Sequence, residues 1–370
     1  MAELRFLSCE SDFFVGRRGR IRRYLICPLQ GLFPVLVRTG PESLAVVFRT
    51  GGAHLGITGT LALATSGDGG RSFSDPMEIL PRWQDNRNPA FGRSRRGTLV
   101  LGFWRAGLQR YRDNPLDGPV WTAENPPGQG GIAAFFTTRS EDGGLTWSEP
   151  RPYLSELLFM SSGYGRVLEL PDGTLLMSIY GAPRDPREGV RHLSVLVRSR
   201  DDGRTWGDES LVAVGYNETA TCLLEDGRLL AAARATEGHV ALLESRDLGR
   251  SFGPPRVITR SGEHPADLCL LESGRLLLTF GRRIRPYGCG ALVSEDGGAS
   301  FDPSREVLLA GDGIRNVDLG YPSTVQLADG HIVTALYYAS GSVGSELLGS
   351  WGEISLQALH YREEELFGPA

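Results

Sequence analysis

The chain has 370 residues, of which 41% are hydrophobic and 22% are charged, and its net charge at pH 7 is −5. This composition is ordinary for a soluble globular protein, and the mild negative charge gives no reason to expect nucleic acid or an anionic membrane as a partner. No apolar run reaches the roughly 18 residues that a membrane-spanning helix needs, so no membrane span is expected.

The beginning of the chain, MAELRFLSCESDFF, lacks the apolar core of a secretory signal, so we expect a cytoplasmic location. The five cysteines are scattered and include no CxxC pair, which argues against a zinc site; Cys222 and Cys269 are expected to be buried free thiols. The sequence contains no cluster of metal ligands, so no metal or other cofactor is expected. It gives no indication of the oligomeric state.

Six segments read as an apolar strand, a tight turn and a second apolar strand. An Asp-Gly pair between two apolar runs is the strongest short-range hairpin signal, and the brevity of these runs favours strands over helices. The six predicted hairpins cover 33–49, 88–104, 164–180, 218–234, 265–281 and 321–337.

Between these hairpins, the pattern Ser-x-Asp-x-Gly-x-Ser/Thr-aromatic occurs five times. A short Asp side chain accepts backbone N–H bonds in a tight turn, and Gly adopts a conformation that other residues resist. The Ser or Thr hydroxyl can bond locally, and the aromatic side chain can pack between strands. We therefore expect five self-bonded turns, at 66–73, 140–147, 199–206, 245–252 and 294–301.

Each of the first five hairpins is followed by a strand-like run, one such turn and a short fourth run. Four-stranded sheets repeated radially form a β-propeller. The sequence therefore predicts an all-β fold, a six-bladed β-propeller with four-stranded antiparallel blades, over residues 1–370 as one domain. The run at 21–27 is expected to complete the terminal blade, and an insertion at 105–131 to form a surface loop or a lid.

The six hairpins begin and end at the same edge of their sheets, because the first residue of a hairpin faces the last. If the hairpins are the innermost strands, these residues form a ring around the propeller axis. Charged and phenolic side chains are costly in a β core unless they line a polar cavity. The opening residues are Phe33, Asn88, Tyr164, Glu218, Pro265 and Tyr321, and the closing residues are Arg49, Trp104, Tyr180, Arg234, Gly281 and Tyr337.

Within this ring, Glu218 is expected to face Arg234, with Tyr321 at the equivalent opening position two units further along. The group can be an ordinary ion pair that stabilises one sheet, or a catalytic pair. Ionising a Tyr phenol at neutral pH costs about 4 kcal/mol without help, and a neighbouring carboxylate can act as the base that activates it.

The repeated turns and this site resemble the sialidase (neuraminidase) superfamily, over about residues 30–340. NET at 217–219, followed by Arg234, resembles the family's base-like Glu and one arginine of its carboxylate-binding triad. DLGYPS at 318–323 resembles the segment that carries its tyrosine nucleophile, which would be Tyr321 here. The resemblance implies a six-bladed propeller that binds an acidic sugar.

The resemblance also implies a further triad arginine in the unit before Tyr321. GRR at 281–283 is similar to the region that supplies it, which favours Arg283, with Arg282 and Arg285 as alternatives. Arginines around one point would bind a carboxylate through charge-assisted hydrogen bonds.

Two features depart from the family pattern. The first-blade Arg-Ile-Pro is replaced by LFP at 32–34, and either Arg87 or Arg49 could take the place of the missing arginine. The loop at 50–60, where the family has its acid/base Asp, contains no Asp or Glu. His54 in that loop and Asp85 are the candidates for this role, and a His is a reasonable general acid near neutral pH.

These residues favour a retaining glycoside hydrolase that cleaves an acidic sugar, such as sialic acid or a related 2-keto sugar acid. Tyr321 would be the nucleophile, Glu218 its base, and His54 or Asp85 the acid/base. Two alternatives remain open, because fold alone does not decide function. One is a propeller that binds an acidic glycan without catalysis, and the other is a polysaccharide lyase that uses His54 and a Tyr.

Overall fold

A computed structural model describes residues 11–14, 20–28, 31–52, 54, 56, 58–82, 84–106, 134–186, 188–313, 318–340 and 353–369. Over these residues the regular structure is mostly β-strand, with one short 3-10 helix, η1 (Pro303–Arg305), and one short α-helix, α2 (Glu363–Phe367). No helix among the described residues is long and apolar enough to cross a membrane. The all-β prediction is confirmed.

The described strands form five hydrogen-bonded sheets. Three have four strands each: β3 (Leu32–Arg38), β4 (Leu44–Thr50), β5 (Thr60–Ser66) and β6 (Met77–Glu78); β15 (Tyr216–Leu223), β16 (Leu229–Ala235), β17 (Val240–Ser245) and β18 (Arg256–Val257); and β19 (Glu263–Leu270), β20 (Leu276–Arg282), β21 (Tyr287–Ser294) and β22 (Val307–Gly313).

The fourth sheet has eight strands: β10 (Arg151–Tyr153), β9 (Ala134–Ser140), β8 (Leu99–Ala106), β7 (Asp85–Arg93), β11 (Leu158–Glu169), β12 (Leu175–Pro183), β13 (Leu193–Ser199) and β14 (Gly207–Val214). Two antiparallel groups of four meet in its middle, where β7 and β11 pair in parallel over just two positions, Gly165 with Ala90 and Arg166 with Phe91. The sequence predicted two separate sheets here. The difference arises because β11 runs close enough to β7 to share backbone hydrogen bonds.

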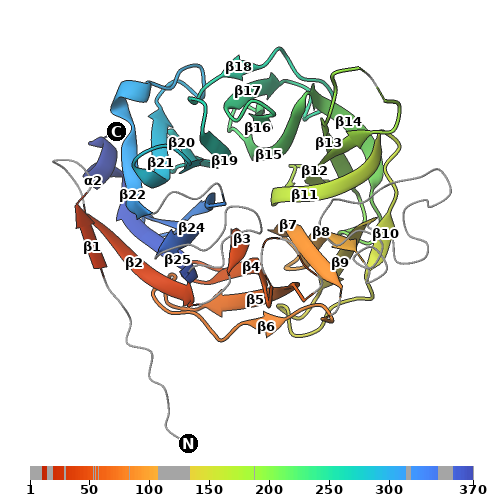
Figure 1. Cartoon of the computed structure of the whole chain (residues 1–370), viewed down its shortest axis with the longest axis horizontal. Helices are drawn as coiled ribbons and strands as arrows, with labels where there is room; N and C mark the ends of the chain where they lie inside the picture. Colours follow the sequence, from red (N-terminus) through yellow and green to blue (C-terminus); the bar gives the residue numbers. More distant parts are fainter. Residues whose placement is uncertain are drawn as a thin grey trace, which may run out of the picture.

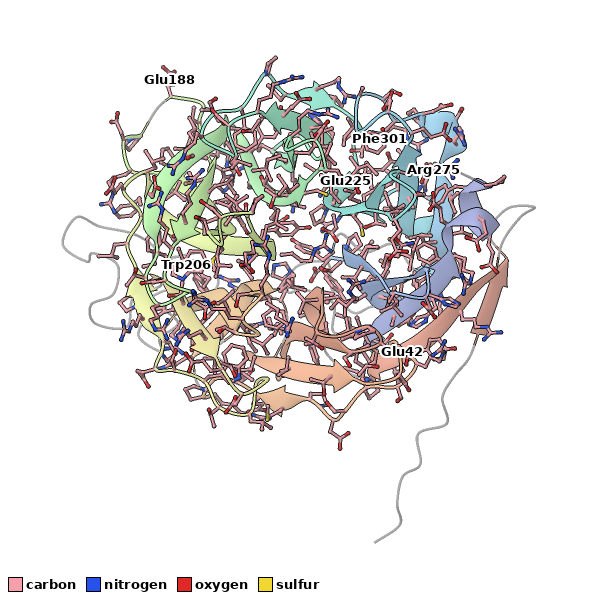
Figure 2. All side chains as sticks on the ribbon, turned by 180° about the vertical axis from the view of Figure 1, so that it is seen from behind. Glu42, Glu188, Trp206, Glu225, Arg275 and Phe301 are labelled. Atoms are coloured by element: carbon pink, nitrogen blue, oxygen red, sulfur yellow. The ribbon has the colours of Figure 1, made fainter. Side chains whose placement is uncertain are left out.

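The fifth sheet joins both ends of the chain, in the order β1 (Ser11–Phe14), β2 (Arg20–Cys27), β25 (Glu353–Arg362), β24 (His331–Ser340) and β23 (Gly320–Gln326). The expectation that 21–27 completes the terminal sheet is therefore confirmed, since β2 pairs with β25 from Arg22 to Cys27. Arg275, labelled in Figure 2, ties α2 to the neighbouring sheet through an ion pair to Glu363 at 3.1 Å.

The sheets are arranged like the blades of a propeller around a common axis (Figure 1). The first strand of each predicted hairpin lies innermost, and each contacts the next around the axis until the last contacts the first; these strands are β3, β7, β11, β15, β19 and β23. We call this ring of strands the hub. Side chains fill the space that the ribbons leave open (Figure 2). The insertion predicted at 105–131 begins later than expected, since Arg105 and Ala106 belong to β8, and its remainder lies outside the described residues.

The five predicted turns all form with the same hydrogen bonds. In the turn at 294–301, Ser294 Oγ donates to Asp296 Oδ1 at 2.6 Å, and the backbone N–H and the hydroxyl of Ser300 donate to the two Asp296 oxygens at 2.8 and 2.6 Å. Gly298 has a φ of 87°, and a Cβ added there would lie 2.9 Å from Leu230. The aromatic residue of each turn packs against a core between neighbouring sheets, so the turns fasten one sheet to the next.

Candidate active site at the hub

A backbone irregularity lies close to the opening residue of every innermost strand. The pairing register of each of these strands is interrupted close to its opening residue, for example between Leu32 and Val35 in β3 and between Gly320 and Ser323 in β23. Such bulges re-aim side chains and are common beside active sites. They also shift the predicted pairing, so that Tyr337 faces Gly320 rather than Tyr321.

Three opening residues carry backbone strain. Phe33, Asn88 and Tyr321 have positive φ values of 53°, 52° and 51°, and each precedes a proline. A bulky residue in the left-handed region is unfavourable, and such outliers concentrate at functional sites. The hub therefore holds these three side chains in conformations that the local sequence alone would not favour.

Tyr321, Glu218 and Arg234 form one hydrogen-bonded group, as the sequence predicted. The Tyr321 hydroxyl donates to Glu218 Oε1 at 2.6 Å, and Arg234 Nη1 donates to Glu218 Oε2 at 2.6 Å. Tyr321 and Glu218 are buried, at 7% and 4% exposed, whereas the Arg234 side chain is 23% exposed. The group therefore sits in the hub with its guanidinium turned partly to solvent.

The surroundings keep the Tyr321 phenol protonated at neutral pH. Burial raises its pKa well above 10 and the negative charge of Glu218 raises it further, while Arg234 and Arg283 act in the opposite direction. Because the phenol is neutral, its O–H can donate to Glu218, and the carboxylate is positioned to accept that proton. Burial alone would lower the pKa of Arg234, but the charge and the hydrogen bond of Glu218, together with Tyr321 and Tyr180, outweigh burial and raise it.

Arg283 lies beside this group. Its guanidinium carbon is 5.7 Å from the centre of the Tyr321 ring, and its Nη2 donates to the Leu319 carbonyl at 3.4 Å. Of the two alternatives, Arg282 is buried and donates to Glu306 at 2.8 Å, and Arg285 is exposed. The structure therefore brings Arg283 next to Tyr321 and engages Arg282 elsewhere.

His54 is the acid/base candidate that the structure brings to the hub. Its Nδ1 lies 2.9 Å from Asp318 Oδ2, and its ring packs edge-on against Phe33 with centroids 4.7 Å apart. Phe33 also packs edge-on against Tyr321 at 4.9 Å. One phenylalanine ring thus touches both His54 and Tyr321. The His54 side chain is 34% exposed, so a ligand can approach it.

Asp85 and Arg49 do not belong to this site. Arg49 Nη1 pairs with Asp85 Oδ1 at 2.6 Å, and both side chains are 0% exposed. Arg49 also donates to the Asn86 carbonyl at 2.6 Å and to the Gly56 carbonyl at 3.0 Å. A fully buried ion pair cannot bind a substrate or protonate a leaving group. The structure therefore does not bring Arg49 or Asp85 to the group of Tyr321, Glu218 and Arg234. Instead, the pair contacts the loop that carries His54, through the Gly56 carbonyl.

Arg87, the other candidate for the missing arginine, lies over Trp104, with its guanidinium carbon 3.9 Å from the ring centre. Its Nε is 3.6 Å from Asp85 Oδ2, and its side chain is 12% exposed. Asn88, the next residue, donates to the Tyr180 hydroxyl at 2.7 Å. Arg87 thus packs on Trp104 and lies near the buried Arg49–Asp85 pair, and its role in carboxylate binding stays a prediction.

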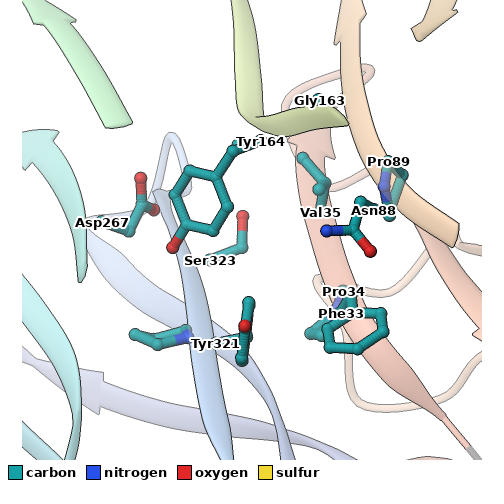
Figure 3. A pocket seen from close by; sticks show the side chains of 12 residues that line it. Phe33, Pro34, Val35, Asn88, Pro89, Gly163, Tyr164, Asp267, Tyr321 and Ser323 are labelled. Carbon is teal, nitrogen blue, oxygen red and sulfur yellow. The ribbon is translucent and has the colours of Figure 1, made fainter. Parts of the chain in front are cut away.

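A narrow cavity of about 20 Å³ adjoins Tyr321, which is close to the space that one water molecule needs (Figure 3). Phe33 and Asn88 line one part of it, and Tyr164 and Asp267 another. Tyr164 is buried, and its hydroxyl donates to the Ala266 carbonyl at 2.9 Å. The cavity is therefore walled by side chains from several innermost strands.

Two polar residues near the hub were missed by the sequence analysis as site residues. Asp318 precedes Tyr321 by three positions, within a segment that was singled out only for the tyrosine. His264 is buried, and burial together with Arg234 and Arg283 lowers its pKa to about 3, so the ring is neutral at physiological pH. The signal for His264 was its place directly before Pro265, an opening residue of the predicted ring.

Two glycines bring the strand of Tyr321 against the neighbouring sheet. A Cβ added to Gly320 would lie 2.6 Å from Gly281 Cα, and one added to Gly281 would lie 2.8 Å from the His264 carbonyl oxygen and 3.2 Å from that of Leu319. Real Cβ atoms do not approach other atoms as closely as 2.8 Å. Gly281, the closing residue of the fifth hairpin, has no room for a side chain, because the backbone just before Tyr321 passes directly over it.

Comparison with known proteins gives consistent matches. The family model of the BNR repeat-like domain matches residues 87–334. A sialidase of Bacteroides fragilis is 23% identical over 263 residues, which are 65% of this chain and 45% of that protein. A sialidase of Micromonospora viridifaciens is 35% identical over 129 residues, 32% of this chain and 19% of that protein. The chain thus spans less than half the length of these curated relatives.

Solved structures share the fold. A protein of unknown function from Dyadobacter fermentans has a TM-score of 0.74 and 22% identity, covering 92% of this chain and 99% of that one. The Trypanosoma rangeli sialidase bound to the inhibitor DANA has a TM-score of 0.68 and 14% identity, covering 97% of this chain and 60% of that one. The family model matches most of the length of this chain. The chain therefore belongs to the BNR repeat-like family, as a divergent member of the sialidase superfamily.

Proposed function

We propose that this protein is a six-bladed propeller glycosidase that removes a terminal acidic sugar, such as sialic acid or a related 2-keto sugar acid, with retention of configuration. The six innermost strands of the hub support the blade count, with the eight-stranded sheet taken as two blades. The observation that carries the activity is the 2.6 Å hydrogen bond from the Tyr321 hydroxyl to Glu218.

In the first step, the Tyr321 oxygen forms a bond to the anomeric carbon while the bond from that carbon to the leaving oxygen breaks. Glu218 takes the phenol proton, and His54 gives a proton to the leaving oxygen. In the second step, His54 takes a proton from water, whose oxygen bonds to the anomeric carbon. The bond to Tyr321 breaks, and Glu218 returns the proton. A neutral phenol that gives its proton to a carboxylate avoids placing a full anion against an acidic substrate.

Arg234 and Arg283 are the cations we assign to the sugar carboxylate, because both flank Tyr321. Charge-assisted hydrogen bonds from guanidinium groups favour a carboxylate over a neutral sugar. The first blade has Leu32-Phe33-Pro34 where the family has Arg-Ile-Pro and so supplies no arginine from this segment, and a substrate somewhat different from that of typical sialidases is expected. Solved structures of the Trypanosoma rangeli sialidase contain sialic acid and a difluoro derivative of a deaminated nononic acid, which makes both sugar types reasonable probes.

The test is hydrolysis of aryl glycosides of sialic, deaminated sialic and uronic acids by the wild type and by Tyr321→Phe. Loss of the hydroxyl is expected to reduce turnover by at least about 10³-fold, because the nucleophile is removed. Tyr153→Phe is the matched control: Tyr153 also donates to a glutamate, Glu209, at 2.6 Å, but outside the hub. It should keep full activity.

The same screen decides between the rival functions. An unchanged rate in Tyr321→Phe would overturn the mechanism. An unsaturated uronate product would identify a lyase. Tight binding of an acidic glycan without any product, measured by calorimetry and long incubation, would identify a binding protein.

A further inference from the structure

We propose that Asp318 is a positioning residue for His54: it holds the imidazole with the proton on Nδ1 and thereby leaves Nε2 as the atom that exchanges a proton with the leaving group. This inference rests on the proposed function, and it names a residue to which neither the family match nor the sequence pattern gave a role. The geometry that carries it is the 2.9 Å distance from His54 Nδ1 to Asp318 Oδ2.

The Asp318 carboxylate is held in a fixed orientation. Its side chain is 8% exposed, and the Tyr337 hydroxyl donates to Oδ1, so Oδ2 is the oxygen turned to His54. Tyr337 is buried, and burial together with Asp318 raises its pKa well above 10, so it remains a donor. Tyr337 also stacks on Tyr321, with ring centroids 5.5 Å apart. The Asp318 carboxylate is thus hydrogen-bonded to a tyrosine that itself stacks on Tyr321, the proposed nucleophile.

The charge state of Asp318 decides which of the two facing atoms, His54 Nδ1 or Asp318 Oδ2, carries a proton. Burial raises its pKa, but the attraction and hydrogen bond of His54, the bond from Tyr337 and the charge of Arg283 outweigh burial and hold the pKa below 3.8. An ionised carboxylate can only accept, so Nδ1 must be the donor and must carry the proton. When the imidazole is neutral, Nε2 then has a free lone pair.

The groups around His54 suit a proton exchange at Nε2. Asp318 faces its Nδ1, the uncharged Phe33 ring packs on one side, and Arg283 acts on Asp318 from the strand end beyond β20. Protonated His54 gives the Nε2 proton to the leaving oxygen and keeps Nδ1–H, and it regains a proton at Nε2 from the incoming water. A base that is oriented by a third group in this way is the general arrangement of a catalytic triad.

The first test needs no substrate. Nitrogen-15 NMR of histidine-labelled wild type, at a pH where the imidazoles are neutral, should show His54 protonated on Nδ1, with its signals assigned by their loss in His54→Gln. In Asp318→Asn the amide oxygen takes the Tyr337 bond and the NH₂ faces Nδ1, so the proton should move to Nε2. A wild-type imidazole protonated on Nε2 would overturn the proposal, even if Asp318→Asn does not fold.

Asp329→Asn is the matched control, because Asp329 Oδ2 lies 2.8 Å from His331 Nδ1 in an exposed turn. This variant should leave the His54 signals unchanged. A change in the His54 tautomer there would mean that the readout reports general perturbation, and the proposal would lose its support.

The second test uses leaving groups. Asp318→Asn should reduce kcat for a sugar with a poor, alkyl-type leaving group by about 10²- to 10⁴-fold, and for a good nitrophenyl leaving group by less than about 10-fold, since the latter needs no protonation. Equal losses for both substrates would indicate a merely structural residue and would overturn the role. If the wild type cleaves no acidic glycoside, the proposed function fails, while the NMR result still decides whether Asp318 sets the tautomer.

Discussion

The first and fourth hairpins of the hub each close on an arginine that pairs with a carboxylate at 2.6 Å, yet only one pair belongs to the candidate site. In the first hairpin, Arg49 pairs with Asp85 of the next unit and both are fully buried. In the fourth, Arg234 pairs with Glu218 of the same hairpin, and the arginine side chain is 23% exposed. Equivalent sequence positions therefore carry different roles.

The difference comes from what lies against the guanidinium. A Cβ on Gly59 would lie 2.0 Å from the Arg49 guanidinium carbon, so the loop closes directly over the charge, and the Gly56 carbonyl accepts from it. Among the described residues no such loop covers Arg234. The second carboxylate oxygen of Glu218 accepts a hydrogen bond from Tyr321 instead. Access, rather than pairing, distinguishes a structural ion pair from one that can meet a ligand.

The largest expected effect tests the fourth hairpin. Glu218→Gln should lower kcat by about 10²- to 10⁴-fold, because an amide cannot take the phenol proton. Its melting temperature should change by only a few degrees, since Arg234 is partly solvated. Steady-state kinetics and calorimetry check both values, with Glu209→Gln as the control that makes the same change at a Tyr–Glu hydrogen bond outside the hub. Activity at the wild-type level would place Glu218 in the same structural class as Asp85.

The next effect tests the first hairpin. Arg49→Met should lower the free energy of unfolding by about 3–5 kcal/mol, because it removes the closest cation to the buried Asp85 and leaves the more distant Arg87 beside it. Arg234→Met should cost roughly 1–2 kcal/mol, since Glu218 keeps the bond from Tyr321. Urea denaturation of both variants checks the difference. Equal losses would show that burial of the pair does not matter, and the comparison of the two hairpins would break down.

The smallest expected effect is on the stability of a repeated turn, whose carboxylate, Asp296, is exposed to solvent, unlike Asp85 and Glu218. Burial is the largest single influence on the pKa of Asp296 and raises it, but the hydrogen bonds from Ser294 and Ser300 together outweigh burial and lower the pKa from 3.8 to about 2. Stability from this turn is therefore fully present above about pH 4 and is lost as the pH falls through 2. Because the side chain is exposed, solvent screening limits the contribution to about 0.5–1 kcal/mol.

Asp296→Asn should therefore be less stable than the wild type at neutral pH, and the two unfolding free energies should converge near pH 2. Urea titrations at several pH values check this. A constant difference across that range would mean that the turn depends on the geometry of the side chain and not on its charge.

Much of the fold was predictable because it depends on repeated local patterns. The Asp-Gly hairpins and the five turns fix strand positions, and the shared edge of the hairpin ends is enough to predict that Glu218, Arg234 and Tyr321 lie together. The roles of Arg49 and Asp85 were not predictable, because they depend on how closely the loop with Gly59 approaches. Asp318 was missed for a similar reason: it lies in a connection before β23, where no repeat sets the side-chain direction.

The crossing of Gly281 and Gly320 limits how this site can vary in sequence. An alanine at either position would push the end of β20 away from the start of β23 and displace the backbone that holds Tyr321 in its positive-φ conformation. The sheets themselves are expected to survive, since the two glycines lie at the ends of β20 and β23. A chain with the same repeats but a side chain at one of these two positions is therefore expected to retain the propeller-like architecture while losing the alignment of its phenol.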